Sequence, residues 1–272
     1  MSDSALVAII VAAAVAAALG GLALVRRFVP VTALKPHTDV AAAIYAALGV
    51  VYGVILGQVV VAAWTTFQAA ESATVDEASS LVNLTRLADA FPEPARATIR
   101  ADVFAYGRAV IDDEWPLMER RQAPSPDAAA AMAQLYRDYT TQATGPIGSL
   151  QTCAQSMTEL DEADDARGAR LLASSHGLPD LLWAVLLAAG VVTVAFSYLF
   201  GVENGVAQHL MVGALAGVVA LLLVLAQALS SPFQAPLRIP PDNYQRVLER
   251  AVPIATPSVA APTPERSSSP GA

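Results

Sequence analysis

The stretch from Val40 to Ala90 constrains the fold of this chain more than any other. It opens with an apolar run, Val40–Trp64, and continues from Thr65 to Ala90 without a glycine or a proline. One helix of this length would measure about 75 Å at 1.5 Å per residue, against roughly 30 Å of hydrocarbon in a bilayer. The sequence therefore predicts a single helix whose first half spans a membrane and whose second half lies outside it.

Four apolar runs approach or exceed the length of a membrane span, in a chain of which 55% of the residues are hydrophobic. They cover residues 5–25, 40–64, 181–200 and 206–229. The first follows an acidic start and is followed by Arg26 and Arg27, so we expect a retained transmembrane helix and not a secretory signal. The predicted fold class is an all-α membrane protein with four transmembrane helices and a large helical extramembrane domain inserted between the second and third.

The expected boundaries follow from composition and from proline and glycine punctuation. Residues 1–69 contain the first two transmembrane helices with a short basic loop, and residues 70–179 form an acidic, all-helical extramembrane domain. Residues 180–230 form a transmembrane hairpin, and residues 231–272 form a C-terminal tail. Within these parts we expect a helix after Pro94, one starting at Ser125-Pro126, one over 147–176 and a short one over 242–251. The tail is rich in Pro, Ser and Ala from about residue 253, which predicts disorder.

Charge is concentrated in the predicted extramembrane domain. Residues 70–179 carry 17 acidic and 9 basic side chains, so the whole formal charge of −8 falls there. This balance argues against nucleic acid or anionic lipid as a partner. We interpret the acidic clusters 112–114 and 161–165 as solvated helix faces, and we expect Arg167 and Arg170 to pair with acids one turn earlier.

The sequence contains no motif for catalysis or for a cofactor. The single Cys153 excludes an intrachain disulfide, the three histidines lack metal-ligand spacing, and the acidic clusters lack the spacing of a calcium loop. Phosphate-binding, dinucleotide-binding and nucleophile-elbow patterns are also absent. We expect no cofactor, no metal site and no enzymatic activity.

Small residues repeat at four-residue spacing in two of the transmembrane segments. Gly49, Gly53 and Gly57 lie along the second, and Gly213 and Gly217 along the fourth. This spacing lets another helix approach closely. The neighbour is either a helix of the same chain, which we favour, or a helix of another subunit.

Two glutamines lie within the predicted spans at a similar depth. Gln58 is near the outer end of the second span, and Gln227 is near the same end of the fourth. An amide in hydrocarbon needs a partner, so a hydrogen bond between the two is the favoured interpretation. The alternative is that one or both line a polar path through the membrane.

Several segments of the chain together resemble the bestrophin-like family of bacterial membrane proteins. The resemblance rests on YGVILGQVVVAAW, FQAAESATVDEASSLVNLTRLA, PARATIRADVFAYGRAVIDDEWPLM, LDEADDARGARLLASSHGLPDLLWAVLLAAG, FSYLFGV and the PF of SSPF. It implies four spans with a helical insert between spans 2 and 3. Bestrophins are pentameric anion channels whose second span lines the pore and whose insert is cytosolic. The sequence has no evenly spaced trio of bulky apolar gate residues in a recognisable neck and no recognisable calcium clasp.

The two lines of reasoning on orientation differ. The first loop carries Arg26, Arg27 and Lys35 and the second carries no basic residue, so the positive-inside rule favours an outward-facing domain. The resemblance implies a cytosolic one.

Our leading hypothesis is a multi-pass protein of the cell membrane that self-associates in the lipid bilayer as a homo-oligomeric ion channel. The alternative is a non-conducting scaffold or stress-sensing protein whose acidic domain binds a partner protein. Polar residues facing a common axis would favour the channel. A second span covered on all sides by the other three would favour the scaffold.

Overall fold

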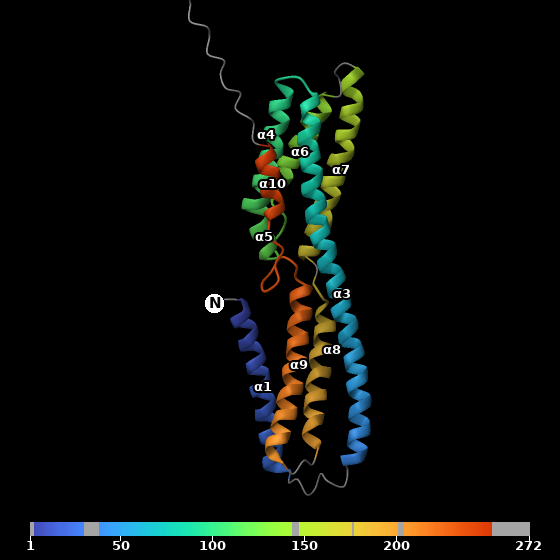
Figure 1. Ribbon diagram of the computed structural model, residues 1–272, viewed down its shortest axis with the longest axis vertical. Helices are drawn as coiled ribbons and strands as arrows, with labels where there is room; N and C mark the ends of the chain where they lie inside the picture. Colours follow the sequence, from blue (N-terminus) through green and yellow to red (C-terminus); the bar gives the residue numbers. More distant parts are fainter. Residues whose placement is uncertain (1–2, 30–37, 143–146, 176, 201–203, 252–272) are drawn as a thin grey trace, which may run out of the picture.

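A computed structural model describes residues 3–29, 38–142, 147–175, 177–200 and 204–251. Its regular secondary structure within these ranges is entirely helical, and the helices form two bundles stacked along one long axis (Figure 1). The lower bundle contains α1 (Asp3–Phe28), the first half of α3 (Thr38–Leu87), α8 (Asp180–Phe196) and α9 (Gly205–Leu229). The upper bundle contains the second half of α3, α4 (Ala95–Ala109), α5 (Trp115–Glu119), α6 (Pro126–Gln142), α7 (Ile147–Ser175) and α10 (Asp242–Ala251).

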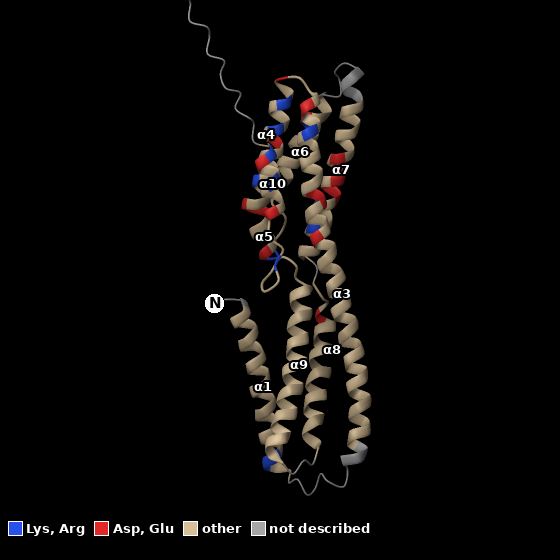
Figure 2. Cartoon of the chain, viewed as in Figure 1, with Lys and Arg blue, Asp and Glu red and all other residues tan. Residues whose placement is uncertain are grey.

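The lower helices are long and apolar enough to cross a membrane. The four candidate spans are Ser4–Phe28, Ala41–Ala90, Asp180–Leu199 and Gly205–Leu229, so the predicted all-α class with four spans is confirmed. Charged side chains gather on the upper bundle, whereas the lower one is nearly free of them between its two ends (Figure 2). Length and charge together therefore assign the lower bundle to the hydrocarbon layer.

The helix α3 belongs to both bundles. It runs for 50 residues and is followed by a 3-10 turn, Ala88–Ala90, before Phe91 and Pro92 end it. Its upper half packs mainly against α7 and also against α4 and α10. The long helix predicted for residues 40–90 is confirmed.

Local signals in the sequence also set the ends of the upper helices. Pro126 is the first residue of α6, and the N–H of Ala128 donates to the Ser125 side-chain oxygen at 3.2 Å. The predicted helix at the C-terminal end is α10, with the expected bounds. The predicted disordered tail from about residue 253 and most of the basic loop lie outside the described residues.

Small and branched side chains pack the lower bundle. Tyr52, Leu56 and Val59 of α3 contact Leu186 of α8 and Ala226 of α9 in one buried cluster. A second cluster joins α1 to α9 through Ala18, Leu22, Val212 and Ala216. Lipid is as apolar as these side chains, so close van der Waals packing holds the helices together.

The core of the upper bundle contains a buried group of charges. Arg170 of α7 is fully buried, and its guanidinium donates to Glu77 of α3 at 2.8 Å and to Glu114 at 2.8 Å. Glu114 ends a π-helical turn, Val110–Glu114, and also accepts from Arg167 at 2.6 Å. The Tyr106 hydroxyl donates to Glu77 at 2.6 Å. Two carboxylates and two guanidiniums thus neutralise one another away from water.

Two sequence expectations are wrong at this cluster. Arg167 and Arg170 pair with residues 53 and 93 positions away, and not with acids one turn earlier. Asp112 and Asp113 are exposed as expected, but Glu114 is buried. Burial raises the pKa of Glu114, but the hydrogen bonds and charges of Arg167 and Arg170 outweigh it and lower the pKa overall. Glu114 therefore stays ionised.

Replacing Glu77 by Gln should destabilise the protein strongly, because it leaves the Arg170 charge half unpaired in the core. We expect the free energy of unfolding to fall by about 3–5 kcal/mol, as for other broken buried ion pairs. Thermal unfolding of the purified protein in detergent measures this loss. The control is Asp112→Asn, which breaks the exposed 2.6 Å pair with Arg108 and should cost less than about 1 kcal/mol. Equal losses in the two variants would contradict the role given to the buried cluster.

Candidate membrane path along α3

One side of the membrane-spanning half of α3 is exposed, with no neighbour among the residues that the structure describes. Tyr52, Leu56, Val59 and Ala63 are buried against α8 and α9 or at their edge. The opposite side exposes the branched residues Val50, Val51, Val54 and Val61, each between 58% and 66% exposed. In hydrocarbon such a side meets lipid or another subunit, so α3 is the edge of the lower bundle and not its centre.

The two glutamines are not paired with each other. Gln58 is exposed on the free side of α3. Gln227 instead donates from its amide nitrogen to the Ser231 hydroxyl at 3.4 Å, one turn further along. The expected Gln58–Gln227 hydrogen bond is therefore wrong, and Gln58 is exposed at a depth where an amide needs a polar neighbour.

The glycines fall into two groups. A side-chain carbon on Gly213 or Gly217 would lie 3.6–3.9 Å from Val15 or Leu19, so these glycines admit α1 against α9. A side-chain carbon on Gly49, Gly53 or Gly57 would meet nothing within 4 Å. The favoured expectation of packing within the chain therefore fails for the α3 glycines, which leave a smooth, open strip on that helix.

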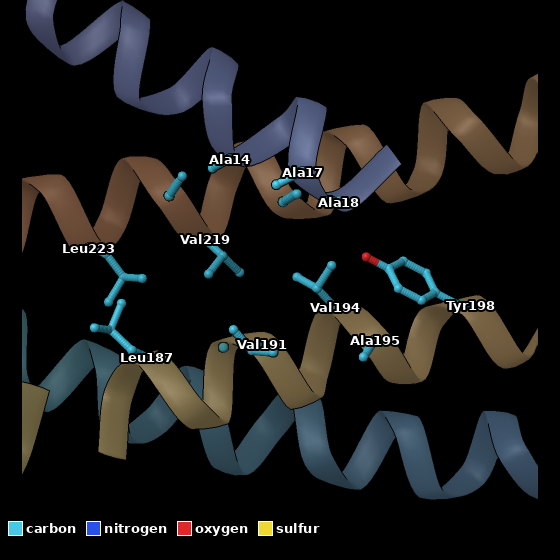
Figure 3. A pocket seen from close by; sticks show the side chains of 13 residues that line it. Ala14, Ala17, Ala18, Leu187, Val191, Val194, Ala195, Tyr198, Val219 and Leu223 are labelled. Carbon is cyan, nitrogen blue, oxygen red and sulfur yellow. The ribbon is translucent and has the colours of Figure 1, made fainter. Parts of the chain in front are cut away.

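A cavity of about 370 Å³ lies between α1, α8 and α9 (Figure 3), and no residue of α3 lines it. Alanines 14, 17 and 18 of α1 face Leu187, Val191 and Val194 of α8 across it. The Tyr198 hydroxyl points into one end, and the 13 lining residues include no charge and no amide. Such walls suit a hydrocarbon chain and would oppose an ion, so this cavity is not an ion path.

A polar cluster that the sequence did not reveal closes the loop end of the lower bundle. Arg26 donates to the side-chain oxygen of Gln208 at 2.9 Å and to the carbonyl of Phe200 at 2.8 Å. Gln208 is buried and also donates to Phe200 at 3.2 Å. The cluster ties α1 to α9 and to the end of α8. Gln208 lies four residues after Asn204, which caps α9. This position near a helix end is the one feature of the sequence that could have pointed to its role.

Arg121 connects the two bundles. Its guanidinium contacts the Ser231 hydroxyl, just after α9. It also lies close to Gly177, just before α8, where a side-chain carbon in place of the glycine hydrogen would lie 3.0 Å from the guanidinium. Arg121 follows α5 and has a positive φ of 53°, an uncommon conformation for a residue with a side chain. The end of α5 is thereby held against the two segments through which the chain passes between bundles.

Two carboxyl groups face each other on the upper bundle. Asp102 of α4 lies against Asp138 of α6, whose carboxylate also accepts from Gln134 at 2.7 Å. Burial, together with the hydrogen bond and the charge of Asp138, raises the pKa of Asp102 to about 7. The hydrogen bond with Asp102 is also the main cause that lowers the pKa of Asp138. Near neutral pH the pair shares one proton, and it titrates as a unit.

Among the described residues, no group of three His, Cys, Asp or Glu side chains is arranged to hold a metal ion. The acidic residues at 161–165 are spread along α7, where Asp161 accepts from Tyr136 at 2.8 Å. The exposed side of the membrane-spanning half of α3 therefore offers one amide, that of Gln58, among apolar side chains.

Comparisons with known proteins agree with this architecture. The profile of the Bestrophin-like domain matches residues 12–244. A bacterial bestrophin homologue from Klebsiella pneumoniae carrying one substitution has a TM-score of 0.71 at 12% identity, over 91% of this chain and 99% of its own. Another structure of a homologue from that organism gives 0.68 at 13% identity, over 89% and 96%. A structure described only as a variant membrane protein gives 0.70 at 12%, over 90% and 97%. No curated protein matches the sequence.

Asp102→Asn should change how stability depends on pH. The pKa of about 7 in the folded protein exceeds the ordinary 3.8, so the folded state favours the protonated acid. This favourable contribution is complete below about pH 4 and is lost as the pH rises through 7. An Asn amide keeps a donor towards Asp138 at every pH. We therefore expect that raising the pH from 5 to 8 lowers the free energy of unfolding of the wild type by about 1–2 kcal/mol more than that of the variant. This is less than the full pKa shift would give, because water screens this half-buried pair.

Thermal unfolding at the two pH values measures this difference, with the exposed Asp113→Asn as the control. Parallel pH curves for wild type and Asp102→Asn would contradict the shared proton.

Proposed function

Because the chain belongs to the bestrophin-like family, we propose that several copies assemble in the plasma membrane around a common axis and form an ion path along α3. In this arrangement the lower bundle spans the bilayer as residues 1–69 and 180–230. The upper bundle, residues 70–179 with α10, is the extramembrane domain. The path lies between subunits, because the cavity among α1, α8 and α9 has apolar walls.

The free side of α3 is the observation that carries the proposal. A subunit that ended there would expose Gln58 to hydrocarbon, where an unpaired amide costs several kcal/mol. A water-filled path at the axis of an oligomer removes that cost. The exposed valines on either side of Gln58 would then form an apolar constriction with one polar ring, which suits a gated path more than an open pore.

The glycine strip supports the contact between subunits. Gly49, Gly53 and Gly57 leave room for a helix that the described part of the chain does not supply. Small residues at four-residue spacing are typical of close contacts between membrane helices. We propose that this strip contacts the neighbouring copy. Gln58 lies on a different side of α3 and would face the axis of the oligomer.

The upper bundle supplies the charge near the mouth of such a path. Its net charge of −8 over residues 70–179 raises the local concentration of cations. The scaffold alternative places the same acidic surface against a partner protein, and it requires no conduction. Flux measurements separate the two hypotheses.

Gln58→Leu should lower ion flux through liposomes that contain the purified protein, because it removes the polar ring from the apolar part of the path. We expect a loss of about tenfold or more if the amide offsets 1–2 kcal/mol of the barrier. The matched control, Ala23→Leu, enlarges an exposed residue on α1 and should leave the flux unchanged. Wild-type liposomes without flux would support the scaffold, and unchanged flux in Gln58→Leu would remove Gln58 from the path.

Gly53→Leu combined with Gly57→Leu should dissociate the oligomer and leave the subunit folded, because a side-chain carbon at either position meets no described atom within 4 Å. Light scattering coupled to size exclusion in detergent measures the mass, and thermal unfolding reports the fold. Gly217→Leu is the control, since its first side-chain carbon would already lie in van der Waals contact with Val15 of α1, and the larger leucine should disturb packing within the subunit itself. A monomeric wild type, or a double variant of unchanged mass, would contradict the assigned interface.

A further inference from the structure

A groove of about 340 Å³ separates the upper half of α3 from α10. Ser79, Asn83 and Arg86 line it from α3, and Asn243, Arg246 and Arg250 line it from α10. Three guanidiniums therefore border one groove in the otherwise acidic upper part of the protein. The groove lies far from Gln58 and is independent of the proposed ion path.

No carboxylate among the described residues pairs with these arginines, and the groove brings three such guanidiniums together. Arg86 donates to the side-chain oxygen of Asn83 at 3.3 Å, and Arg246 donates to that of Asn243. Within the described ranges, none of Arg86, Arg246 and Arg250 forms an ion pair.

Some other arginines of the upper bundle pair with an acid, whereas the exposed Arg137 has, among the described residues, only the amide oxygen of Gln134 as a hydrogen-bond partner. Arg100 reaches Asp89 at 2.8 Å, and Arg108 reaches Asp112 at 2.6 Å. The groove thus gathers three positive charges that form no ion pair within the described ranges; the one carboxylate bonded to its lining, that of Glu159, accepts from Asn83 at 3.1 Å.

We propose that this groove binds a small, water-soluble anion that carries two or more phosphate groups. Arg246 and Arg250 are four residues apart, so both project from the same side of α10. Arg86 faces them from α3, which allows phosphate oxygens to be held from both walls. Guanidinium groups bind phosphate through paired hydrogen bonds, and the side chains of Ser79 and Asn243 add neutral hydrogen-bonding groups. The volume is at the lower end of the range for small-molecule sites, which limits the ligand to a compact one.

The position of the groove favours a dissolved anion over a lipid headgroup. Trp64 is the aromatic residue at the outer end of the membrane-spanning half of α3. Val75, the groove residue nearest to it in sequence, lies about 16 Å further along the helix, and Arg86 lies about 33 Å further. A headgroup at the level of Trp64 does not reach the guanidiniums.

Calorimetric titration of the purified full-length protein in detergent with inorganic pyrophosphate tests the site. We expect saturable binding that weakens as the salt concentration rises, because exposed charges are screened. Arg246→Gln combined with Arg250→Gln should weaken it about tenfold or more, because two charged hydrogen-bonding groups are lost. Arg108→Gln removes one positive charge outside the groove and should bind like the wild type.

Three results would overturn the proposal. The first is pyrophosphate binding that the double variant and Arg108→Gln change equally, which would indicate attraction by overall charge. The second is binding of short-chain phosphatidic acid without binding of pyrophosphate, which would indicate a lipid site. The third is absence of pyrophosphate binding together with a change in oligomer mass in the double variant, which would make the groove a contact between subunits. Thermal unfolding of each variant verifies that it is folded.

Discussion

Arg170 carries a charge that has no contact with water, and the upper bundle is built around the two carboxylates that neutralise it. Glu77 comes from α3, Glu114 from the π-helical turn after α4, and Arg170 from α7, so one guanidinium joins three separate segments. The aromatic rings of Trp115 and Tyr244 cover the guanidinium at 5.4 and 5.7 Å and bring α5 and α10 to the same point. A buried ion pair adds little net stability over apolar residues of the same size, but it strongly penalises any arrangement that separates the charges. The cluster thereby selects one register of α7 along α3.

The lower bundle has no comparable centre. Its helices meet through alanine, glycine and branched side chains, and polar contacts are placed at its ends, where Arg26 binds Gln208 and Arg121 binds Ser231. The described chain therefore has an upper part held together by buried charges and a membrane part in which one side of α3 is exposed. The two halves of α3 thus lie in different surroundings, the upper packed against α7 and the lower covered on one side only.

Much of the fold could be predicted from the sequence because its signals are local. The absence of glycine and proline from 65 to 90 gave the length of α3, and Ser125-Pro126 gave the start of α6. The pairings could not be predicted, because they depend on how helices rotate against one another. Hydropathy places Gln58 and Gln227 at one depth but does not set the angle between α3 and α9. The same limit hid Glu77 as a partner of Arg170, and it hid the groove, because Arg86 is about 160 positions from Arg246 in sequence and only packing brings them together.

The continuity of α3 has a mechanical consequence. The helix has no proline or glycine between Gly57 and its end, so it lacks the usual places for a kink. Its lengths below and above Trp64 are about 40 Å and about 35 Å. It therefore has two arms of nearly equal length on one unbroken backbone. A tilt of the upper arm, which packs along α7, would turn the membrane-spanning arm with it in the opposite direction.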